Sequence, residues 1–439
     1  MTTIKYKVPK LDGPIDWTVE VPGSKSMTNR ALLIAALADG TTTLKGVLFS
    51  EDSRNFLSCL KALGFQVRID EIKKMVTVEG LNGTIPVTSG EIYVGSAGTA
   101  ARFLTAMLAM AEGTFVINSS EQMKKRPMKP LFHVLEDIGA EIVYLEKEGF
   151  LPIKIKGIGG RLPIDKRCNI KLDISESTQF LSALMLISPM VKQGLCIEIT
   201  SVRKDGAYIR ITRKMMEQFG VVIDFDGTRY FVEQGVCYSS GCYQIEPDVS
   251  AACYFYAAAA LTGGRTIVKN ITWKCMQGDL KFLELLEKMG CQVTETSDGI
   301  QVCGATNGRL KGITVDMKDF SDQTMTLAIL APFADSDIRI ENIGHIRLQE
   351  SDRIHAIVTE LTRLGISCKE ETDAITIHPG TPKPVVIQTY EDHRIAMAFA
   401  LIGLRVEGIE ISNPMCCKKT FETYFEVLDS LCNQTVNLQ

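Results

Sequence analysis

The chain has 439 residues, more than a single hydrophobic core usually supports, so we expect two globular domains. Its net charge of −4 and pI near 5.9 argue against the broad positive field of proteins that bind nucleic acid or anionic membranes. Any basic binding site must therefore be local, and we expect no nucleic acid partner.

Targeting and membrane segments are not expected. The first twenty residues mix charges and prolines with apolar residues, and they lack the apolar core of a secretory signal. The longest apolar runs, such as residues 395–402, reach about half of the roughly 20 residues that a membrane-spanning helix needs. The 13 cysteines form neither a close-paired zinc pattern nor a small disulfide framework. We expect a cytoplasmic protein with reduced thiols and no membrane association.

One pattern recurs six times along the chain. A short opening of small or polar residues precedes a stretch rich in Ala, Leu and Met, which is typical of a buried helix. The openings recur at intervals of roughly 70 to 80 residues, at Ser24–Ser26, Ser96–Thr99, Ser177–Gln179, Asp248–Ser250, Asp322–Thr324 and Asp392–Arg394. In the first five repeats a second, amphipathic stretch follows and ends at a glycine, namely Gly64, Gly139, Gly220, Gly290 and Gly365.

Each repeat predicts the order strand, helix, strand, helix, strand, strand. Glycine ends a helix readily because it adopts the left-handed conformation, and strand-like runs such as residues 291–296 follow these glycines. Two groups of three repeats predict two similar α/β domains with helices packed inward and sheets facing outward. We place one domain at residues 23–246 and the other at residues 1–22 and 247–439. Because the N-terminal strand precedes the first helix opening, we expect it to complete the second domain.

The six openings also predict anion binding. Each places Ser, Thr, Asp or Gly where a helix has unpaired N–H groups and the positive end of its dipole. Any one opening is explained as a simple helix cap. If three helices of each domain direct their N-termini at a shared cleft, that cleft attracts anions even in an acidic protein. We therefore expect a multiply anionic substrate.

Basic residues lie near the openings of the first half. Lys25 stands at a helix start, and Gly98 lets backbone amides approach an anion one turn before Arg102. The stretch at residues 23–26 lacks the earlier glycine that a phosphate-binding P-loop requires. Arg126 follows two lysines, which fit a solvated loop equally well, and precedes a proline that restricts the backbone.

Carboxylates and basic residues alternate in the second half. Asp322, Glu350 and Asp392 lie at helix openings, and the neighbouring basic residues are Arg347, Arg353, His393, Arg394 and Lys419. Such a mixture suits proton transfer in an anionic site, but structural ion pairs at helix ends have the same appearance in sequence. Both interpretations stay open at this point.

The motifs together resemble the family of 5-enolpyruvylshikimate-3-phosphate (EPSP) synthases. The matching segments are Pro22–Ser26 with Asn29 and Arg30, Gly98–Ala100 with Arg102, Arg126–Pro127, Ser177–Gln179, Glu350–Arg353, Asp392–Arg394 and Lys419–Phe421. They occur in the family's order from Pro22 to Phe421, so the resemblance covers the whole chain. It implies a two-domain inside-out α/β barrel that closes over two anionic substrates, with no metal, no organic cofactor and a monomeric state.

The resemblance also implies the reaction. Members of the family transfer the enolpyruvyl group of phosphoenolpyruvate to the 5-hydroxyl of shikimate 3-phosphate by addition and elimination, and they release phosphate. This reaction belongs to the shikimate pathway to chorismate and aromatic amino acids. The domain at residues 23–246 should carry much of the shikimate 3-phosphate site, and the other domain should complete the phosphoenolpyruvate site.

Individual roles are carried over by position. The resemblance implies that shikimate 3-phosphate is held by Lys25, Ser26, Arg30, Ser177, Thr178, Gln179, Tyr208, Asp322 and Gln349. It implies that phosphoenolpyruvate is held by Lys25, Gly98, Arg126, Gln179, Arg353, Arg394 and Lys419. For catalysis, Asp322 is the expected base, Glu350 and Lys25 move protons, Lys419 takes part, and His393 supports them.

Four positions depart from the family's usual pattern. Gln349 replaces a common lysine, His345 a common asparagine and Phe103 a proline found in several members, while Asp205 falls near an expected serine. Glutamine carries no charge, so binding by this loop needs another cation, for which the candidates are Arg347, Arg203 and Lys204. Since Phe103 changes the helix that begins at Gly98, the room for the herbicide glyphosate is not predicted.

Three alternative functions differ from this one in their acceptor or in lacking catalysis. The sister family that transfers enolpyruvyl to UDP-N-acetylglucosamine carries a reactive cysteine before the Arg-Pro pair, and residues 117–126 contain none. A paralogue with another anionic cyclic acceptor is suggested by Gln349 and His345. A non-catalytic anion-binding protein would have no evident need for Asp322 and Glu350 beside its cations.

Overall fold

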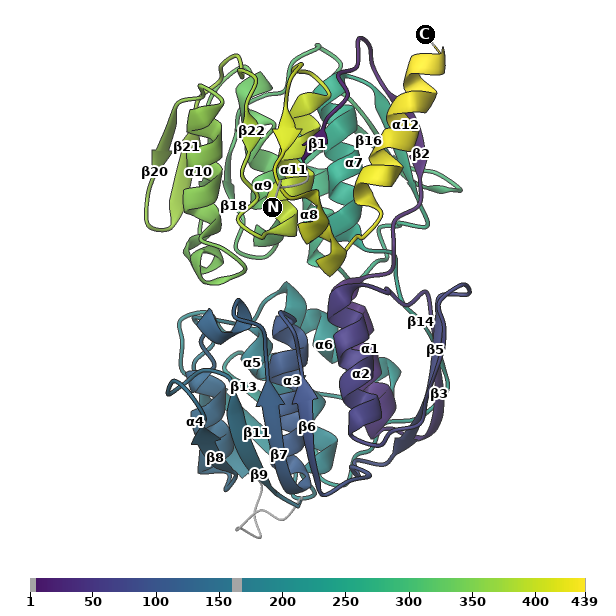
Figure 1. Cartoon of the computed structure of the whole chain (residues 1–439), viewed down its shortest axis with the longest axis vertical. Helices are drawn as coiled ribbons and strands as arrows, with labels where there is room; N and C mark the ends of the chain where they lie inside the picture. The colour runs from purple at the N-terminus through teal and green to yellow at the C-terminus, as the bar shows by residue number, and fades with distance from the viewer. Residues whose placement is uncertain (1–4, 160–167, 439) are drawn as a thin grey trace. The chain divides into compact units, whose positions relative to one another are not determined.

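The computed structural model describes residues 5–159 and 168–438 (Figure 1). The chain divides into two compact units, one of residues 23–246 and one of residues 1–22 with 247–439. We call them the contiguous unit and the split unit. Among the described residues, no helix is long and apolar enough to span a membrane.

The contiguous unit has three four-stranded sheets among its described residues. Their strands, in spatial order, are β14 (Cys242–Gln244), β3 (Asp39–Lys45), β5 (Met75–Leu81) and β4 (Val67–Asp70); β6 (Ser89–Tyr93), β7 (Glu112–Asn118), β9 (Ile153–Ile158) and β8 (Glu141–Tyr144); and β10 (Cys168–Leu172), β11 (Leu195–Ile199), β13 (Arg229–Val232) and β12 (Asp224–Phe225). The helices are α1 (Lys25–Leu37), α2 (Glu51–Ala62), α3 (Gly98–Met110), α4 (Lys129–Asp137), α5 (Gln179–Leu186) and α6 (Ala207–Gln218).

The split unit repeats this arrangement in its described residues. Its sheets are β16 (Gln292–Glu295), β17 (Gly299–Cys303), β15 (Arg265–Lys269) and β2 (Asp16–Val19); β18 (Thr314–Asp316), β19 (Ile338–Glu341), β21 (Ala374–Ile377) and β20 (Cys368–Glu370); and β1 (Tyr6–Lys7), β23 (Glu410–Ile411) and β22 (Val386–Ile387). The helices are α7 (Val249–Thr262), α8 (Lys281–Lys288), α9 (Thr324–Ala328), α10 (Arg353–Arg363), α11 (His393–Gly403) and α12 (Tyr424–Leu438).

The six-fold repeat is confirmed by the sheet topology. In each four-stranded sheet one edge strand is parallel to its neighbour, and the remaining neighbours are antiparallel. Two of these parallel edge strands come from distant parts of the chain: β14 pairs with β3, and β2 pairs with β15. The N-terminal strand β2 thus lies in a sheet of the split unit, where Figure 1 shows it in purple.

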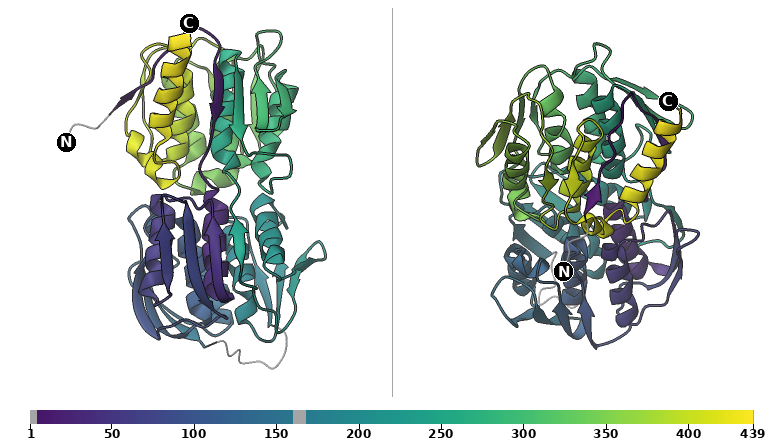
Figure 2. Two further views of the ribbon diagram at one scale, coloured as in Figure 1. Left: turned by 90° about the vertical axis from the view of Figure 1, so that its right-hand side faces the viewer. Right: turned by 45° about the horizontal axis from the view of Figure 1, so that its top comes forward.

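Two kinds of helix alternate along each repeat. The first helix of a repeat is buried on all sides, as in α3 and in α7 from Val249 to Leu261, because its small and apolar residues leave no polar face. The second helix is amphipathic and packs one face inward, as in α6 and α8. The sheets line the outer faces of each unit around the buried helices (Figures 1 and 2). The inward packing of helices is thus confirmed within each unit.

The helix ends follow the predicted glycine signal, whereas side-chain caps form at only two of the six openings. All five glycines that follow the second helices have positive φ, between 84° at Gly365 and 108° at Gly139. Asp248 and Asp392 cap α7 and α11 through side-chain oxygens that accept from the amides of Ala251 and Arg394. The fifth opening differs, because Asp322 lies in a 3₁₀ turn, η4 (Ser321–Gln323), before the short helix α9.

Candidate active site

The N-termini of three helices meet at one end of the contiguous unit. Asn29 of α1 donates from Nδ2 to Oγ1 of Thr99 in α3 at 2.6 Å. Arg102 of α3 donates to Oε1 of Gln179, the first residue of α5, at 3.2 Å. Because each of these ends carries the positive pole of a helix dipole, together they form a surface that favours anions.

Lys25 lies at this end, above a buried carboxylate. Its Nζ is 3.5 Å from Oδ2 of Asp52, which is buried in the first turn of α2. Asp52 was not among the predicted site residues, since its sequence signal is that of an ordinary acidic first turn. The pair holds the lysine ammonium at the start of α1.

Gly98 begins α3 directly against two guanidinium groups. A Cβ atom at this position would lie 2.6 Å from Nη1 of Arg102 and 2.6 Å from Nη1 of Arg126. Arg102 is fixed by the carbonyls of Gly98 and Pro127 as well as by Gln179. The structure therefore brings Gly98, Arg126 and Gln179 together, as expected for one binding site.

Arg30 lies deeper in the same unit. Its guanidinium donates to the carbonyls of Ser26 and Tyr208 and to the hydroxyls of Thr212 and Ser182. Burial lowers its pKa to about 10. Arg30 thus connects the backbone of Ser26 to that of Tyr208, two residues that are far apart in sequence.

Ser177 and Thr178 precede α5 at this same end of the unit. The Ser177 hydroxyl accepts from the amide of Gln179 at 3.2 Å, and Thr178 is the residue that precedes the helix. Both side chains are half-buried. Hydroxyls at this position can donate to an anion that rests on the helix N-terminus.

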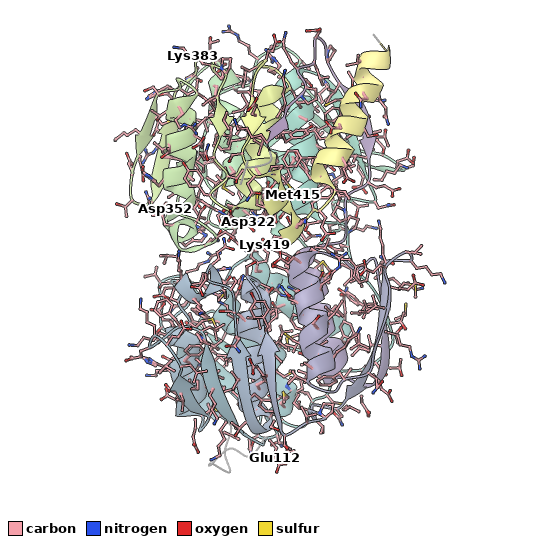
Figure 3. All side chains as sticks on the ribbon, in the orientation of Figure 1. Glu112, Asp322, Asp352, Lys383, Met415 and Lys419 are labelled. Carbon is pink, nitrogen blue, oxygen red and sulfur yellow. The ribbon has the colours of Figure 1, made fainter. Side chains whose placement is uncertain are left out.

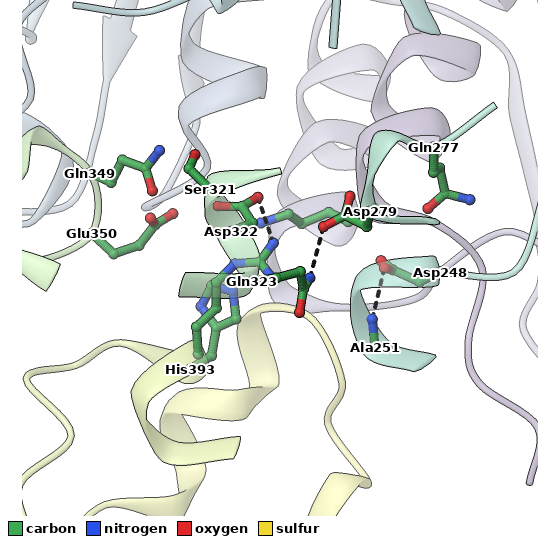
Figure 4. A network of polar contacts seen from close by, with 12 residues as sticks. Asp248, Ala251, Gln277, Asp279, Ser321, Asp322, Gln323, Gln349, Glu350 and His393 are labelled. Carbon is green, nitrogen blue, oxygen red and sulfur yellow. Dashed lines mark hydrogen bonds and ion pairs between the residues drawn. The ribbon is translucent and has the colours of Figure 1, made fainter. Parts of the chain in front are cut away.

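Arg353 is the centre of the cluster in the split unit. It is only 1% exposed, and its guanidinium contacts Asp392 at 2.8 Å, Glu350 at 2.9 Å and Asp322 at 3.0 Å. Burial alone would lower the pKa of Arg353, but the carboxylates outweigh it and keep the pKa above its ordinary value. One arginine, the first residue of α10, therefore joins residues from η4, from the loop before α10 and from the start of α11. Figure 4 shows two of its partners, Asp322 and Glu350.

Two further cations share these carboxylates. Arg394 donates to Oδ2 of Asp322 at 2.8 Å, and Nζ of Lys419 lies 3.4 Å from Oε1 of Glu350. The Lys419 side chain is 5% exposed, and its ammonium makes no hydrogen bond within the described parts of the chain. A buried ammonium with one loose ion pair has donors to offer an anionic ligand. Figure 3 shows Asp322 and Lys419 at the same end of the split unit, opposite Lys383.

Known proteins with a similar sequence or fold identify the family of this chain. The family model of EPSP synthase (3-phosphoshikimate 1-carboxyvinyltransferase) matches residues 10–428. The chain belongs to the EPSP synthase family. The predicted family is thereby confirmed.

Its relatives within the EPSP synthase family cover nearly the whole chain. The chain is 43% identical to the 3-phosphoshikimate 1-carboxyvinyltransferase of Trichormus variabilis, over 95% of this chain and 97% of that protein. It is 40% identical to 3-phosphoshikimate 1-carboxyvinyltransferase 2 of Halalkalibacterium halodurans, over 96% and 93% of the two chains. The solved EPSP synthase of Acinetobacter baumannii has a TM-score of 0.81, 25% identity and 98% coverage of both chains. The predicted two-domain α/β fold is confirmed.

The positions that depart from the usual pattern of EPSP synthases have definite partners. Gln349 accepts from Arg353 through Oε1, and His345 Nε2 lies 2.8 Å from Oγ of Ser321. Asp205 pairs with Arg210 at 2.7 Å. Phe103 lies against the Arg30 guanidinium, whose central carbon is 5.3 Å from the ring centroid.

The expectation that Arg347 compensates for Gln349 is not supported. The Arg347 guanidinium contacts Asp352 and Glu370 at 2.9 Å and donates to the carbonyls of Glu371 and Thr372. It therefore fastens the loop that precedes α10 to the turn between β20 and β21. Lys204 donates to the carbonyl of Ile199, and Arg203 donates to that of Asp205.

His393 is buried beside the Arg353 cluster. Its Nδ1 lies 3.9 Å from Oδ1 of Asp392, and the side chain is 1% exposed. This position agrees with a supporting role near Asp392. Among the described residues, no group of three or more His, Cys, Asp or Glu side chains is arranged to hold a metal ion.

Asp279 is a buried carboxyl that sequence reasoning missed. It lies in the 3₁₀ turn η3 (Gly278–Leu280), and its Oδ1 accepts from Nε2 of Gln323 at 2.7 Å (Figure 4). Burial and the neighbouring Asp322 raise its pKa to about 6, although Arg394 lowers it in part. Its neighbours Gln277, Gly278 and Lys281 are polar or small, so the local sequence gives no signal that Asp279 is buried.

Asp279→Asn should stabilise the split unit at pH 8. An aspartate has an ordinary pKa of 3.8, so ionisation costs more in the folded than in the unfolded chain. Folding stability therefore falls as pH rises from about 4 to about 6 and stays lower above that. We expect a gain of about 1–3 kcal/mol for Asp279→Asn at pH 8 and little gain at pH 4, measured by urea unfolding.

The matched control for this prediction is Asp335→Asn. Hydrogen bonds from the Gly312 amide and Ser336 lower the pKa of Asp335, so its ionised form favours folding and this substitution should destabilise at pH 8. Equal pH profiles for wild type and Asp279→Asn would contradict the prediction.

Proposed function

We propose that the protein transfers the enolpyruvyl group of phosphoenolpyruvate to the 5-hydroxyl of shikimate 3-phosphate and releases phosphate. Family membership carries the proposal: the EPSP synthase model matches residues 10–428, and relatives of that name are 40–43% identical over at least 95% of the chain. The chemistry of the two units supports the proposal. The helix N-termini of the contiguous unit and the Arg353 cluster of the split unit both offer cations to anions, and the Arg353 cluster also contains Asp322 and Glu350 as candidate proton acceptors.

Shikimate 3-phosphate is assigned mainly to the contiguous unit. Lys25 and the hydroxyls of Ser26, Ser177 and Thr178 suit its phosphate, because they stand at helix starts. Arg30 and Tyr208 fix the floor beneath Ser26 and line the ring side. Gln179 lies between this group and Arg102. From the split unit, Asp322 and Gln349 are assigned to the same substrate.

Phosphoenolpyruvate is assigned to the guanidinium groups of both clusters and to Lys419. Its phosphate and carboxylate suit Arg126, Arg353 and Arg394, and Gly98 leaves the space in front of Arg126 open. An entering phosphate competes with Asp322 for Arg394 and with Glu350 for Lys419. Substrate binding would thus release each carboxylate from one of its ion pairs and make it a better proton acceptor.

The chemistry proceeds in two balanced steps. Asp322 takes the proton of the 5-hydroxyl as its oxygen bonds to C2 of phosphoenolpyruvate, and the methylene carbon gains a proton from Lys25 or Glu350. In the second step the methyl carbon returns that proton to the group that supplied it, the double bond to C2 forms again, and the bond from C2 to the phosphate oxygen breaks. The proton held by Asp322 passes to the departing phosphate. Lys419 and the arginines offset the charge that gathers on the departing phosphate.

The test is phosphate release by the purified protein. Release should require phosphoenolpyruvate and shikimate 3-phosphate together, and enolpyruvylshikimate phosphate should appear as the product. Each substrate alone is the control. A folded protein that binds phosphoenolpyruvate but releases no phosphate with this acceptor would refute the acceptor assignment. Size-exclusion chromatography tests the monomeric state, which is part of the proposal together with a cytoplasmic location.

Gly98→Ala should weaken phosphoenolpyruvate binding more than shikimate 3-phosphate binding. The added Cβ must push aside the ends of Arg102 and Arg126, each 2.6 Å away. We expect KM for phosphoenolpyruvate to rise about tenfold, equivalent to roughly 1.4 kcal/mol, with KM for shikimate 3-phosphate within about twofold. Gly90→Ala is the control for adding a methyl group, because the nearest atom to its Cβ position, Cδ1 of Phe115, is 4.0 Å away. A rise of equal size in both KM values would contradict the assignment of Gly98.

A further inference from the structure

The chain turns sharply just before the Arg353 cluster. The amide of Asp392 donates to the carbonyl of Thr389 at 2.8 Å, and the two residues between them, Tyr390 and Glu391, have φ of 54° and 56°. Positive φ at both central residues is the pattern of a type I′ turn, which glycine and asparagine favour. A tyrosine followed by a glutamate is costly there, because each Cβ meets its own backbone.

The turn sets the position of Asp392 and, through it, its contacts with Arg394 and Arg353. Asp392 follows it directly and caps α11 by accepting from the amide of Arg394. The same carboxylate accepts from Ser351 at 3.0 Å and from Arg353 at 2.8 Å. A rotation of this turn would therefore move Asp392 and the first turn of α11 together.

A buried carboxylate holds the turn from the side of α10. Glu360 is fully buried, and its Oε1 accepts from the Tyr390 hydroxyl at 2.8 Å. Its Oε2 accepts from the Gln388 amide at 3.1 Å and from Arg363. All these donors flank or belong to the turn, except Arg363 of α10 itself. A charge this deep needs such partners, so the contact is specific.

A second contact holds the turn from the other side. Oε1 of Glu391 accepts from Nδ2 of Asn413 at 3.0 Å. Asn413 immediately precedes the 3₁₀ segment η7 (Pro414–Lys419), which ends at Lys419. The strained turn thus has an anchor on α10, which begins at Arg353, and an anchor on the segment that carries Lys419.

From these contacts we infer that Glu360 and Tyr390 are positioning residues for the reaction. They hold residues 389–392 in a strained turn and thereby direct Asp392 at Arg353 and place Arg394. Strain of this kind persists only where the surroundings over-determine it, and it gathers at functional sites. The inference rests on the proposed function for its kinetic consequence, while its geometric part concerns anion binding by the cluster alone.

The experiment removes only the Tyr390 hydroxyl. Tyr390→Phe should raise KM for phosphoenolpyruvate about fivefold to tenfold, the effect of one lost charge-assisted hydrogen bond, with KM for shikimate 3-phosphate within about twofold. Tyr390→Gly, which loses the same hydroxyl but adopts φ of 54° without strain and keeps the Glu391 contact, should lose less than Tyr390→Phe. Glu360→Gln, which keeps the shape but removes the charge, should act in the same direction as Tyr390→Phe.

The control separates positioning from general stability. Tyr238→Phe also removes one buried hydroxyl, which donates to the Leu186 carbonyl in the contiguous unit, and it should change the melting temperature but neither KM. Calorimetric binding of inorganic phosphate gives a readout without turnover, and it should weaken about fivefold in Tyr390→Phe. Equal phosphate affinity and equal KM values in Tyr390→Phe and wild type would overturn the inference. Absence of turnover in wild type, with the phosphate difference intact, would refute the proposed function alone.

Discussion

Asp322→Asn should lower kcat by about 10²–10⁴-fold, the usual contribution of a general base. The amide has nearly the same shape, and its single oxygen can still accept from one of the two arginines, Arg353 or Arg394, which contact separate carboxylate oxygens at 3.0 and 2.8 Å. It cannot take up the proton of the acceptor hydroxyl. We therefore expect both substrates to bind within a few-fold of wild type, measured by steady-state phosphate release and by calorimetry.

Asp335→Asn provides the comparison for this result. Asp335 is an exposed aspartate of the same unit, and its carboxylate accepts from the amide of Gly312 and the hydroxyl of Ser336. Its kcat should equal that of wild type. If Asp322→Asn kept more than about a tenth of the wild-type kcat, the base would have to be sought elsewhere. If the protein were a non-catalytic binding protein, wild type, Asp322→Asn and Asp335→Asn would all show no turnover.

Arg353→Met should destabilise the split unit by about 3–5 kcal/mol, the cost of removing one partner from a buried ion pair. The substitution leaves Asp392 and Glu350 buried without their main cation, whereas methionine fills a similar volume. Both tryptophans, Trp17 and Trp273, belong to this unit, so urea unfolding followed by tryptophan fluorescence reports on it.

The same measurement on Arg347→Met supplies the control. Arg347 also has two carboxylate partners, Asp352 and Glu370, but these are 44% and 31% exposed. Exposed pairs contribute about 0–1 kcal/mol, so the loss should be small. Similar losses in the two variants would mean that burial does not strengthen the Arg353 cluster.

The fold was predictable because its signals are local and repeated. Glycines such as Gly64 and Gly365 mark helix ends through a backbone conformation that other residues avoid. Buried helices such as α7 show an unbroken apolar run, and amphipathic ones such as α8 do not. The fifth repeat departs from the pattern, since a 3₁₀ turn replaces the expected cap at Asp322.

The candidate site was predictable only in part. Lys25, Gly98, Arg353 and Arg394 stand at helix starts, where sequence position indicates function. The partners of these residues come from elsewhere in the chain, and only tertiary packing brings them close. Asp52 reaches Lys25 from the next helix, and no local motif announces that contact.

The direction of a side chain is equally hidden in sequence. Arg347 lies two residues before Gln349, yet its guanidinium binds the turn after β20 because Glu370 and the carbonyls of that turn attract it. Glu360 looks like an ordinary acid on an amphipathic helix, although it is fully buried. The spacing of residues in the sequence shows which of them share a helix face. It does not show which carboxylate a cation will pair with in the folded protein.

The pairing of β2 with β15 and of β14 with β3 also affects how the protein is made. During synthesis β2 leaves the ribosome first, but its partner strand follows only after the entire contiguous unit. Strand β2 therefore has no partner strand until translation has passed residue 269, the end of β15. Deleting the first 22 residues would remove strands β1 and β2 from this unit. An N-terminal truncation of this length would therefore remove part of two sheets, and not a disordered tail.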